Sequence, residues 1–150
     1  MATEAGAILV VEDNPQDATM TLRALKKHNV ANTIVLARDG AEALDYLYGT
    51  GAHAGRDPAD LPHVVLLELK LPKVDGMQVL TRIRSEAVTK LLPVVILTSS
   101  DEQRDLVESY QLGVNSFVRK PVDFAAFTEA VSQLGLYWTL INRTPRQEKS

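Results

Sequence analysis

The sequence has no cysteine, so neither disulfide bonds nor thiolate chemistry is available to it. No apolar run approaches the roughly 20 residues that a membrane-spanning helix needs. The net charge is only −3, which argues against nucleic acid or an anionic membrane as the main partner. The N-terminus lacks the basic start and apolar stretch of a signal peptide. We therefore predict a cytoplasmic protein without a nucleic-acid or membrane partner.

The length and composition are those of one soluble globular domain. The chain has 150 residues, of which 45% are hydrophobic and 23% are charged. There is no internal repeat, low-complexity tract or linker. We treat residues 1–150 as a single domain with short tails at 1–6 and 143–150.

A short apolar strand and the acid that follows it are the most informative stretch. Val64 to Leu67 are four consecutive apolar residues, which predicts a buried strand. A strand that is apolar on both faces needs helices on both sides, as in a parallel sheet. Glu68 follows directly, at the end where open α/β folds place their ligand site.

Similar signals predict five strands that alternate with five helices, and hence a doubly wound α/β domain. Asn14 and Pro15 indicate a helix cap and first turn, and Ser99 with Glu102 resembles a capping box. Asp75-Gly76 indicates a turn. The predicted strands are 7–11, 33–37, 63–67, 93–97 and 116–119, and the predicted helices begin near Pro15, Ala41, Gly76, Ser99 and Asp123. The segment Gly49–Pro62 is predicted to be an irregular surface loop.

Polar residues follow four of the five strands. Because parallel strands end at one edge of a sheet, these side chains should converge. Clustered carboxylates repel one another, and Mg²⁺ relieves that repulsion. An ammonium group can bind a phosphoryl oxygen, so the set fits phosphoryl chemistry on an acidic side chain. The residues concerned are Glu12, Asp13, Glu68, Thr98, Ser99 and Lys120.

Four motifs together resemble the receiver domain of response regulators in two-component signalling. They are Val-Val-Glu-Asp-Asn-Pro, Leu-Lys-Leu-Pro-Lys-Val-Asp-Gly, Leu-Thr-Ser-Ser and Val-Arg-Lys-Pro, within a match from about Ala7 to Ile141. The resemblance implies a flavodoxin-like, chemotaxis-regulator-like fold with strand order 2-1-3-4-5. It also implies a signalling protein, not an enzyme.

The same resemblance assigns roles to individual residues. Glu68 stands at the phosphoacceptor position, and Thr98 and Lys120 would sense and contact the phosphoryl group. Phe117 falls at the aromatic switch position, although core packing is an equal alternative. The Lys120–Pro121 bond would be cis. The Mg²⁺ ligands would be Glu12, Asp13, Glu68 and the backbone carbonyl of Lys70.

The family's phosphoacceptor is Asp, and this chain has Glu68 there. The extra methylene adds about 1.5 Å of reach, and misplacement on that scale can cost on the order of 100-fold in a positioned reaction. We therefore predict poor or no phosphorylation, and weak or absent Mg²⁺ binding. Glu68 either imitates the phosphorylated state in part or disables the site. We also predict an ion pair between Glu68 and Lys120.

The expected partners are other proteins. The insertion Gly49–Pro62 and the motif Gly135-Leu-Tyr-Trp138 resemble single-domain regulators of phytochrome-type sensor histidine kinases. Apolar residues off the main face of the last helix, such as Tyr137 and Leu140, predict a homodimer through the fourth helix, fifth strand and fifth helix.

Three other functions compete with this interpretation. A flavin or nucleotide binder needs a phosphate cradle after the first strand, where this chain has Glu12 and Asp13. A Mg²⁺ phosphohydrolase needs an Asp nucleophile with a second Asp two residues later, which Glu12-Asp-Asn14 does not supply. A pseudo-receiver that binds partners irrespective of phosphate stays open.

Overall fold

The protein is a parallel five-stranded sheet covered by helices, as seen in a computed structural model that describes residues 6–27, 32–99 and 102–119. The strand order is β2-β1-β3-β4-β5, and every neighbouring pair is parallel, so the predicted fold and strand order are confirmed. The strands are β1 (Ile8–Val11), β2 (Ile34–Ala37), β3 (Val64–Leu67), β4 (Val94–Thr98) and β5 (Ser116–Arg119). The helices are α1 (Pro15–Lys27), α2 (Gly40–Tyr48), the 3₁₀ turn η1 (Gly51–His53), α3 (Gly76–Ser85) and α4 (Gln103–Gln111).

Some predictions fall outside the described residues. They are the helix predicted from Asp123, the C-terminal tail at 143–150, most of the N-terminal tail, and the Lys120–Pro121 bond. In the part of the chain that the structure describes, no helix is long and apolar enough to span a membrane.

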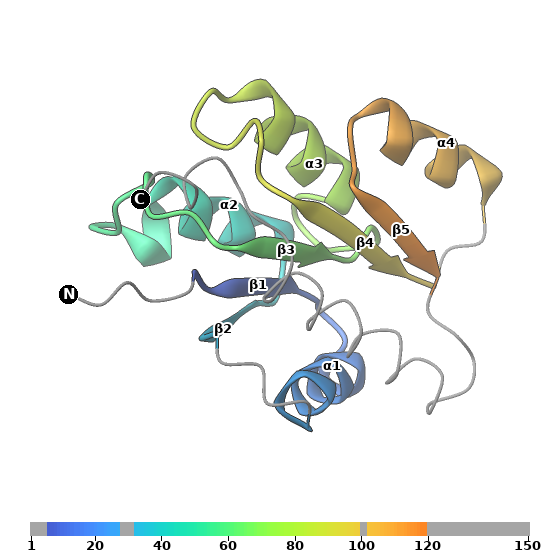
Figure 1. Ribbon diagram of the computed structural model, residues 1–150, viewed down its shortest axis with the longest axis horizontal. Coiled ribbons are helices and arrows are strands. Elements are labelled where there is room, and N and C mark those ends of the chain that lie inside the picture. Colours follow the sequence, from blue (N-terminus) through green and yellow to red (C-terminus); the bar gives the residue numbers. More distant parts are fainter. Residues whose placement is uncertain (1–5, 28–31, 100–101, 120–150) are drawn as a thin grey trace.

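The helices form a layer on each face of the sheet. Figure 1 shows α1 on one side and α2, α3 and α4 on the other. Successive residues of a strand point to opposite faces, so Leu9 and Val11 pack towards α2 and α3 while Ile8 and Val10 pack towards α1. All four are buried, because both faces of the strand are covered.

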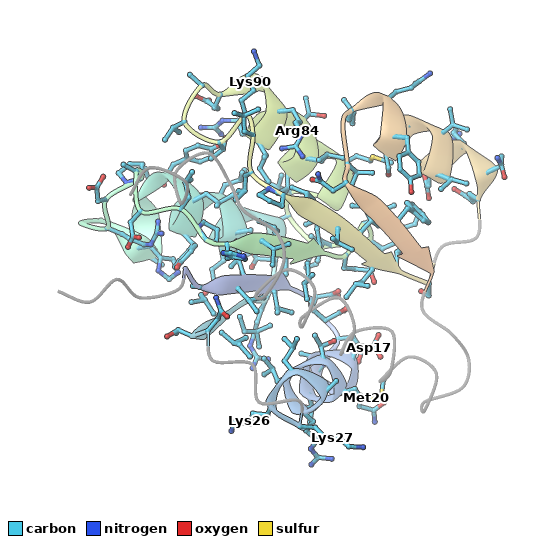
Figure 2. The ribbon with its side chains drawn as sticks, in the orientation of Figure 1. Asp17, Met20, Lys26, Lys27, Arg84 and Lys90 are labelled. Atoms are coloured by element: carbon cyan, nitrogen blue, oxygen red, sulfur yellow. The ribbon has the colours of Figure 1, made fainter. Side chains whose placement is uncertain are left out.

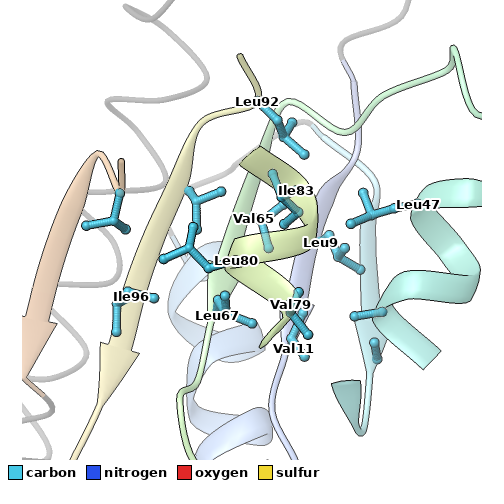
Figure 3. Close-up of a cluster of buried hydrophobic side chains, with 14 of the residues drawn as sticks. Leu9, Val11, Leu47, Val65, Leu67, Val79, Leu80, Ile83, Leu92 and Ile96 are labelled. Carbon is cyan, nitrogen blue, oxygen red and sulfur yellow. The ribbon is translucent and has the colours of Figure 1, made fainter. Parts of the chain in front are cut away.

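The larger apolar cluster lies between the sheet and the helices α2 and α3. Leu80 and Ile83 of α3 lie against Val65 and Leu67 of β3, and Leu47 of α2 joins them (Figure 3). All five side chains are fully shielded from solvent. This packing holds the C-terminal end of β3, and therefore Glu68, in a fixed place.

The helix starts agree with the sequence signals in only some cases. Asn14 caps α1, since its Oδ1 accepts hydrogen bonds from the backbone N–H groups of Gln16 and Asp17 at 2.9 and 3.0 Å. Asp75 was predicted to lie in a turn, and it forms a capping box with Gln78 at the start of α3.

The capping box predicted for Ser99 and Glu102 is wrong. Helix α4 begins at Gln103 with Glu102 as its N-cap residue, and that cap has no side-chain hydrogen bond. The carbonyl of Glu102 already accepts the first helical hydrogen bond, from Asp105 N at 3.1 Å. Ser99 therefore lies a full turn too early to cap the helix.

The insertion at residues 49–62 is more ordered than predicted. It contains η1, and the guanidinium of Arg56 lies 3.8 Å from the ring centroid of Tyr46 in α2. Arg56 also donates to the carbonyls of Tyr46 and Asp60. Arg56 therefore holds the insertion against α2 through its contacts with Tyr46.

Arg84 joins the end of α3 to the loops around β4 and β5. Its guanidinium donates four hydrogen bonds, to the carbonyls of Lys90, Leu92 and Gly113 and to the side chain of Asn115. Figure 2 shows Arg84 and Lys90 together beside α3. Partial burial lowers the pKa of Arg84, because desolvation disfavours the charged guanidinium. The sequence contains no pattern that predicts this contact.

Candidate functional site

The C-terminal ends of β1, β3 and β4 lie next to one another at one edge of the sheet. Val11 is paired with Leu67, and Leu67 is paired with Ile96, so Glu12 and Glu68 follow adjacent strands and Thr98 ends the next strand. Glu12 is 5% exposed, Glu68 is 4% exposed and Thr98 is fully buried. Two buried acids and a buried hydroxyl group therefore lie at this one edge of the sheet, and two of them, Glu68 and Thr98, are in direct contact.

The carboxylate of Glu68 is turned back onto its own loop. Its Oε2 accepts hydrogen bonds from Leu69 N at 2.8 Å, from Lys70 N at 3.1 Å and from the hydroxyl of Thr98 at 2.6 Å. A buried carboxylate needs such donors, and hydrogen bonds to a charged group are the stronger kind. The arrangement places a negatively charged oxygen in a cradle of two backbone amides and one hydroxyl.

The acids after β1 differ in their surroundings. Glu12 is buried, and its Oε2 accepts a hydrogen bond from Asn14 N at 3.1 Å. Asp13 is exposed and lines a cavity of about 440 Å³ beside Lys70, Asp75 and Asp105. This cavity lies over the loop that follows Glu68, so the structure brings Asp13 to the same edge of the sheet.

The fit of these residues to a divalent cation is incomplete. Among the described residues, no group of three or more His, Asp or Glu side chains is arranged to hold a metal ion. The groups that face Oε2 of Glu68 are hydrogen-bond donors, which suit an anionic oxygen and oppose a cation. Glu12 and Asp13 keep the oxygen chemistry that Mg²⁺ prefers.

Two further residues of the predicted site are Lys120 and Phe117, of which the structure describes only Phe117. Lys120 lies outside the described residues, so its ion pair with Glu68 stays a prediction. Phe117 lies on β5, paired with Ile96, and packs half-buried against the larger apolar cluster. Its packing role is confirmed, and its switching role stays a prediction.

The loop after Glu68 contains contacts that the sequence did not predict. Lys70 lies 3.8 Å from Asp105 of α4, and Lys73 lies 3.4 Å from Asp39 at the start of α2. Lys73 also has a positive φ of 67°, which is unusual for a residue other than glycine. Ion pairs between a loop and a distant helix have no periodic signature, so no sequence pattern could have found them.

Gly76 is required where the loop returns to the sheet. A Cβ atom at this position would lie 2.4 Å from the carbonyl oxygen of Glu68 and 2.6 Å from Cα of Leu69. Such contacts are far too close, so only glycine permits this approach. The backbone of the loop is thereby held against Glu68.

Comparison with known proteins places the chain among signalling proteins. The family model described as "Response regulator receiver domain" matches residues 8–132. The chain is 41% identical to the probable methanogenesis regulatory protein FilR2 of Methanothrix harundinacea, over 92% of this chain and 86% of that protein. It is 32% identical to the response regulator Rcp1 of Synechocystis, over 87% of each protein.

Solved structures agree with these relatives. The phosphorylated cyanobacterial phytochrome response regulator RcpA superposes with a TM-score of 0.87 at 34% identity, covering 95% of this chain and 99% of that one. The Mn²⁺-bound form of Rcp1 gives 0.86 at 31% identity, covering 93% and 99%. The bacteriophytochrome response regulator AtBRR gives 0.72 at 53% identity, covering 94% and 100%.

Proposed function

The chain belongs to the response regulator receiver domain family, and from this premise we propose that it is a two-component response regulator in which Glu68 replaces the phosphoacceptor, giving a form that is phosphorylation-deficient or imitates the phosphorylated state in part. The similar solved structures include phytochrome response regulators. The observation that carries the proposal is the state of Glu68, which stands where the family resemblance puts the phosphoacceptor.

Phosphoryl transfer to a carboxylate requires an oxygen that is free to attack and correctly placed. Oε2 of Glu68 already accepts three hydrogen bonds, one of them from Thr98. The side chain is also one methylene longer than Asp, and such misplacement can slow a positioned reaction on the order of 100-fold. Glu68 therefore accepts phosphate poorly or not at all.

The same geometry supports partial imitation of the phosphorylated state. Thr98 has the role of sensing the phosphoryl group by family resemblance, and its hydroxyl already donates to Glu68 at 2.6 Å. A carboxylate carries a single negative charge, whereas a phosphoryl group carries about −1.5 to −2 and three acceptor oxygens. Glu68 thus accepts a hydrogen bond from Thr98 in the absence of phosphate, and it carries less charge than a phosphoryl group would bring.

Mg²⁺ binds more weakly with Glu at position 68 than it would with Asp at that position. Glu12, Asp13 and the backbone carbonyl of Lys70 would hold the cation, which neutralises clustered carboxylates when bound. Oε2 of Glu68 faces N–H and O–H donors instead of the cation. The solved Mn²⁺-bound form of Rcp1 supplies the precedent for a divalent cation in a related regulator.

The proposed partner is a sensor histidine kinase of the phytochrome type, since several similar structures are phytochrome response regulators. Signalling would proceed in the cytoplasm through protein contacts, without nucleic acid or membrane as partners. We also propose a homodimer through α4, β5 and the helix predicted from Asp123. Val107 and Tyr110 of α4 are 46% and 51% exposed, which supports this surface.

A pseudo-receiver that binds partners independently of phosphate is the second candidate, because the hydrogen-bonded Glu68 suits it equally. The variant Glu68→Ala separates the two. If Glu68 imitates the phosphorylated state in part, the protein loses affinity for its partner when the carboxylate is removed. A pseudo-receiver binds as well as before.

The direct test is incubation with acetyl phosphate and Mg²⁺, followed by intact mass measurement. Glu68→Asp should gain one phosphoryl group, and the unaltered chain should not. Glu68→Gln is the matched control, because it keeps the length of the side chain and removes its charge. Ready uptake of phosphate by the unaltered chain would refute the proposal.

A further inference from the structure

The buried face of helix α4 is polar, unlike the mainly apolar buried faces of the other helices that the structure describes. Its buried residues are Asp105 and Ser109, whereas the buried residues of α3 are apolar apart from glycine. Two large apolar side chains of α4, Val107 and Tyr110, point outward and are about half exposed. Helix α4 therefore contacts the rest of the domain through directional polar interactions as well as through apolar packing.

Both of these polar residues contact the segment that follows Glu68. Oδ2 of Asp105 lies 3.8 Å from Nζ of Lys70, and the hydroxyl of Ser109 donates to Sδ of Met77 at 3.8 Å. Lys70 also donates its backbone N–H to Oε2 of Glu68 at 3.1 Å. One residue, Lys70, thus contacts Glu68 through its backbone and α4 through its side chain.

We infer that Lys70 and Asp105 are positioning residues that couple the state of Glu68 to the orientation of α4, and hence to the exposed surface of Val107 and Tyr110. The inference rests on the proposed function, in which Glu68 determines the state of the site. It adds a route through the loop after β3, separate from the hydrogen bond to Thr98. When Glu68 releases Lys70 N, the start of this loop shifts, and Asp105 follows the ammonium.

The ion pair between Lys70 and Asp105 is weak enough to shift the balance between two orientations of α4. The Asp105 side chain is only 12% exposed, so its carboxylate is poorly solvated and depends on nearby polar partners. The Lys70 side chain is 64% exposed, and ion pairs of this kind are individually weak. Breaking the pair should therefore loosen α4 without unfolding the domain.

The test is hydrogen–deuterium exchange of the full chain, read at residues 103–111. Lys70→Met should raise the exchange rate of α4 by about two- to fivefold, the factor that corresponds to one such ion pair. Lys70→Arg should restore the original rate. Lys73→Met is the matched control, because Lys73 lies in the same loop, is 68% exposed and pairs with Asp39 beside α2. It should leave α4 unchanged.

Two further variants test the coupling itself. Lys70→Met combined with Asp105→Asn should exchange no faster than Lys70→Met alone, because both changes break the same contact. Glu68→Ala should accelerate exchange in α4, and should do so much less in a chain that already carries Lys70→Met. Equal exchange in Lys70→Met and Lys73→Met would overturn the inference. That result would leave the proposed function intact, since phosphorylation is measured separately by mass.

Discussion

Replacing Thr98 by valine would remove one hydrogen bond from the site and leave its shape almost unchanged. The Thr98 hydroxyl donates to Oε2 of Glu68 at 2.6 Å, and both residues are buried. Valine keeps the β-branched outline but puts a methyl group against a carboxylate. The two backbone amides of Leu69 and Lys70 still donate to that oxygen. The substitution therefore measures how strongly Thr98 is held in the absence of phosphate.

The expected loss follows from the charge of the acceptor. A hydrogen bond to an ionised group contributes about 1.5–3 kcal/mol, and its removal leaves part of a buried charge without a donor. We expect Thr98→Val to lower the free energy of unfolding by about 2 kcal/mol. For a chain of this size, that loss lowers the melting temperature by about 4–8 °C. In a Glu68→Gln background the same change should cost only about 1 kcal/mol, since the acceptor is neutral.

The assay is urea denaturation of the unaltered chain and the three variants that make up this cycle, Thr98→Val, Glu68→Gln and the two combined. Thr19→Val is the control, because the Thr19 hydroxyl donates to the carbonyl of Pro15 at 2.9 Å in an exposed position on α1. It should change stability by less than about 0.5 kcal/mol. A loss below about 0.5 kcal/mol for Thr98→Val, or an equal loss in the Glu68→Gln background, would refute the idea that Glu68 holds Thr98 through its charge.

Three further changes test other parts of the fold. Arg84→Met should destabilise the protein by about 2–4 kcal/mol, because it removes all four hydrogen bonds of the guanidinium. In contrast, Arg82→Met breaks an exposed ion pair and should cost about 0–1 kcal/mol in the same denaturation experiment. Gly76→Ala should cost about 1–3 kcal/mol or more, since its Cβ would lie 2.4 Å from the Glu68 carbonyl oxygen; full stability would contradict that contact. Burial raises the pKa of Tyr48, so the folded chain keeps this proton to a higher pH than the unfolded chain, and stability should fall as the pH rises above about 10. Denaturation at several alkaline pH values should show a shallower fall for Tyr48→Phe, and an unchanged slope would contradict this cause.

The strands and the location of the site were predictable because both depend on local patterns. Runs such as Val64 to Leu67 are apolar on both faces, and only a parallel sheet between two helical layers buries such strands fully. Parallel strands end at one edge, so acids and hydroxyls after the strands had to gather there. Asn14 was predictable as a cap for a similar reason, since its partners lie two and three residues away.

The errors arose where a contact depends on parts of the chain that are distant in sequence, or where two local signals compete. The Ser99 signal for a helix start was valid in its spacing, but α4 begins three residues later with Glu102 as its cap. Tyr46 of α2 is buried, and Arg56 of the insertion lies over its ring. Neither outcome can be derived from periodicity, which describes one element at a time.

The amino-acid sequence alone determined the fold, the edge of the sheet that carries the site, and the presence of a carboxylate one methylene too long at position 68. Only the tertiary structure decided what that carboxylate does. Its Oε2 accepts hydrogen bonds from two amides of its own loop and from Thr98, because β4 ends with the Thr98 hydroxyl 2.6 Å from that oxygen. The tertiary structure likewise set Lys70 against Asp105, because the position of α4 relative to this loop depends on the packing of the whole domain.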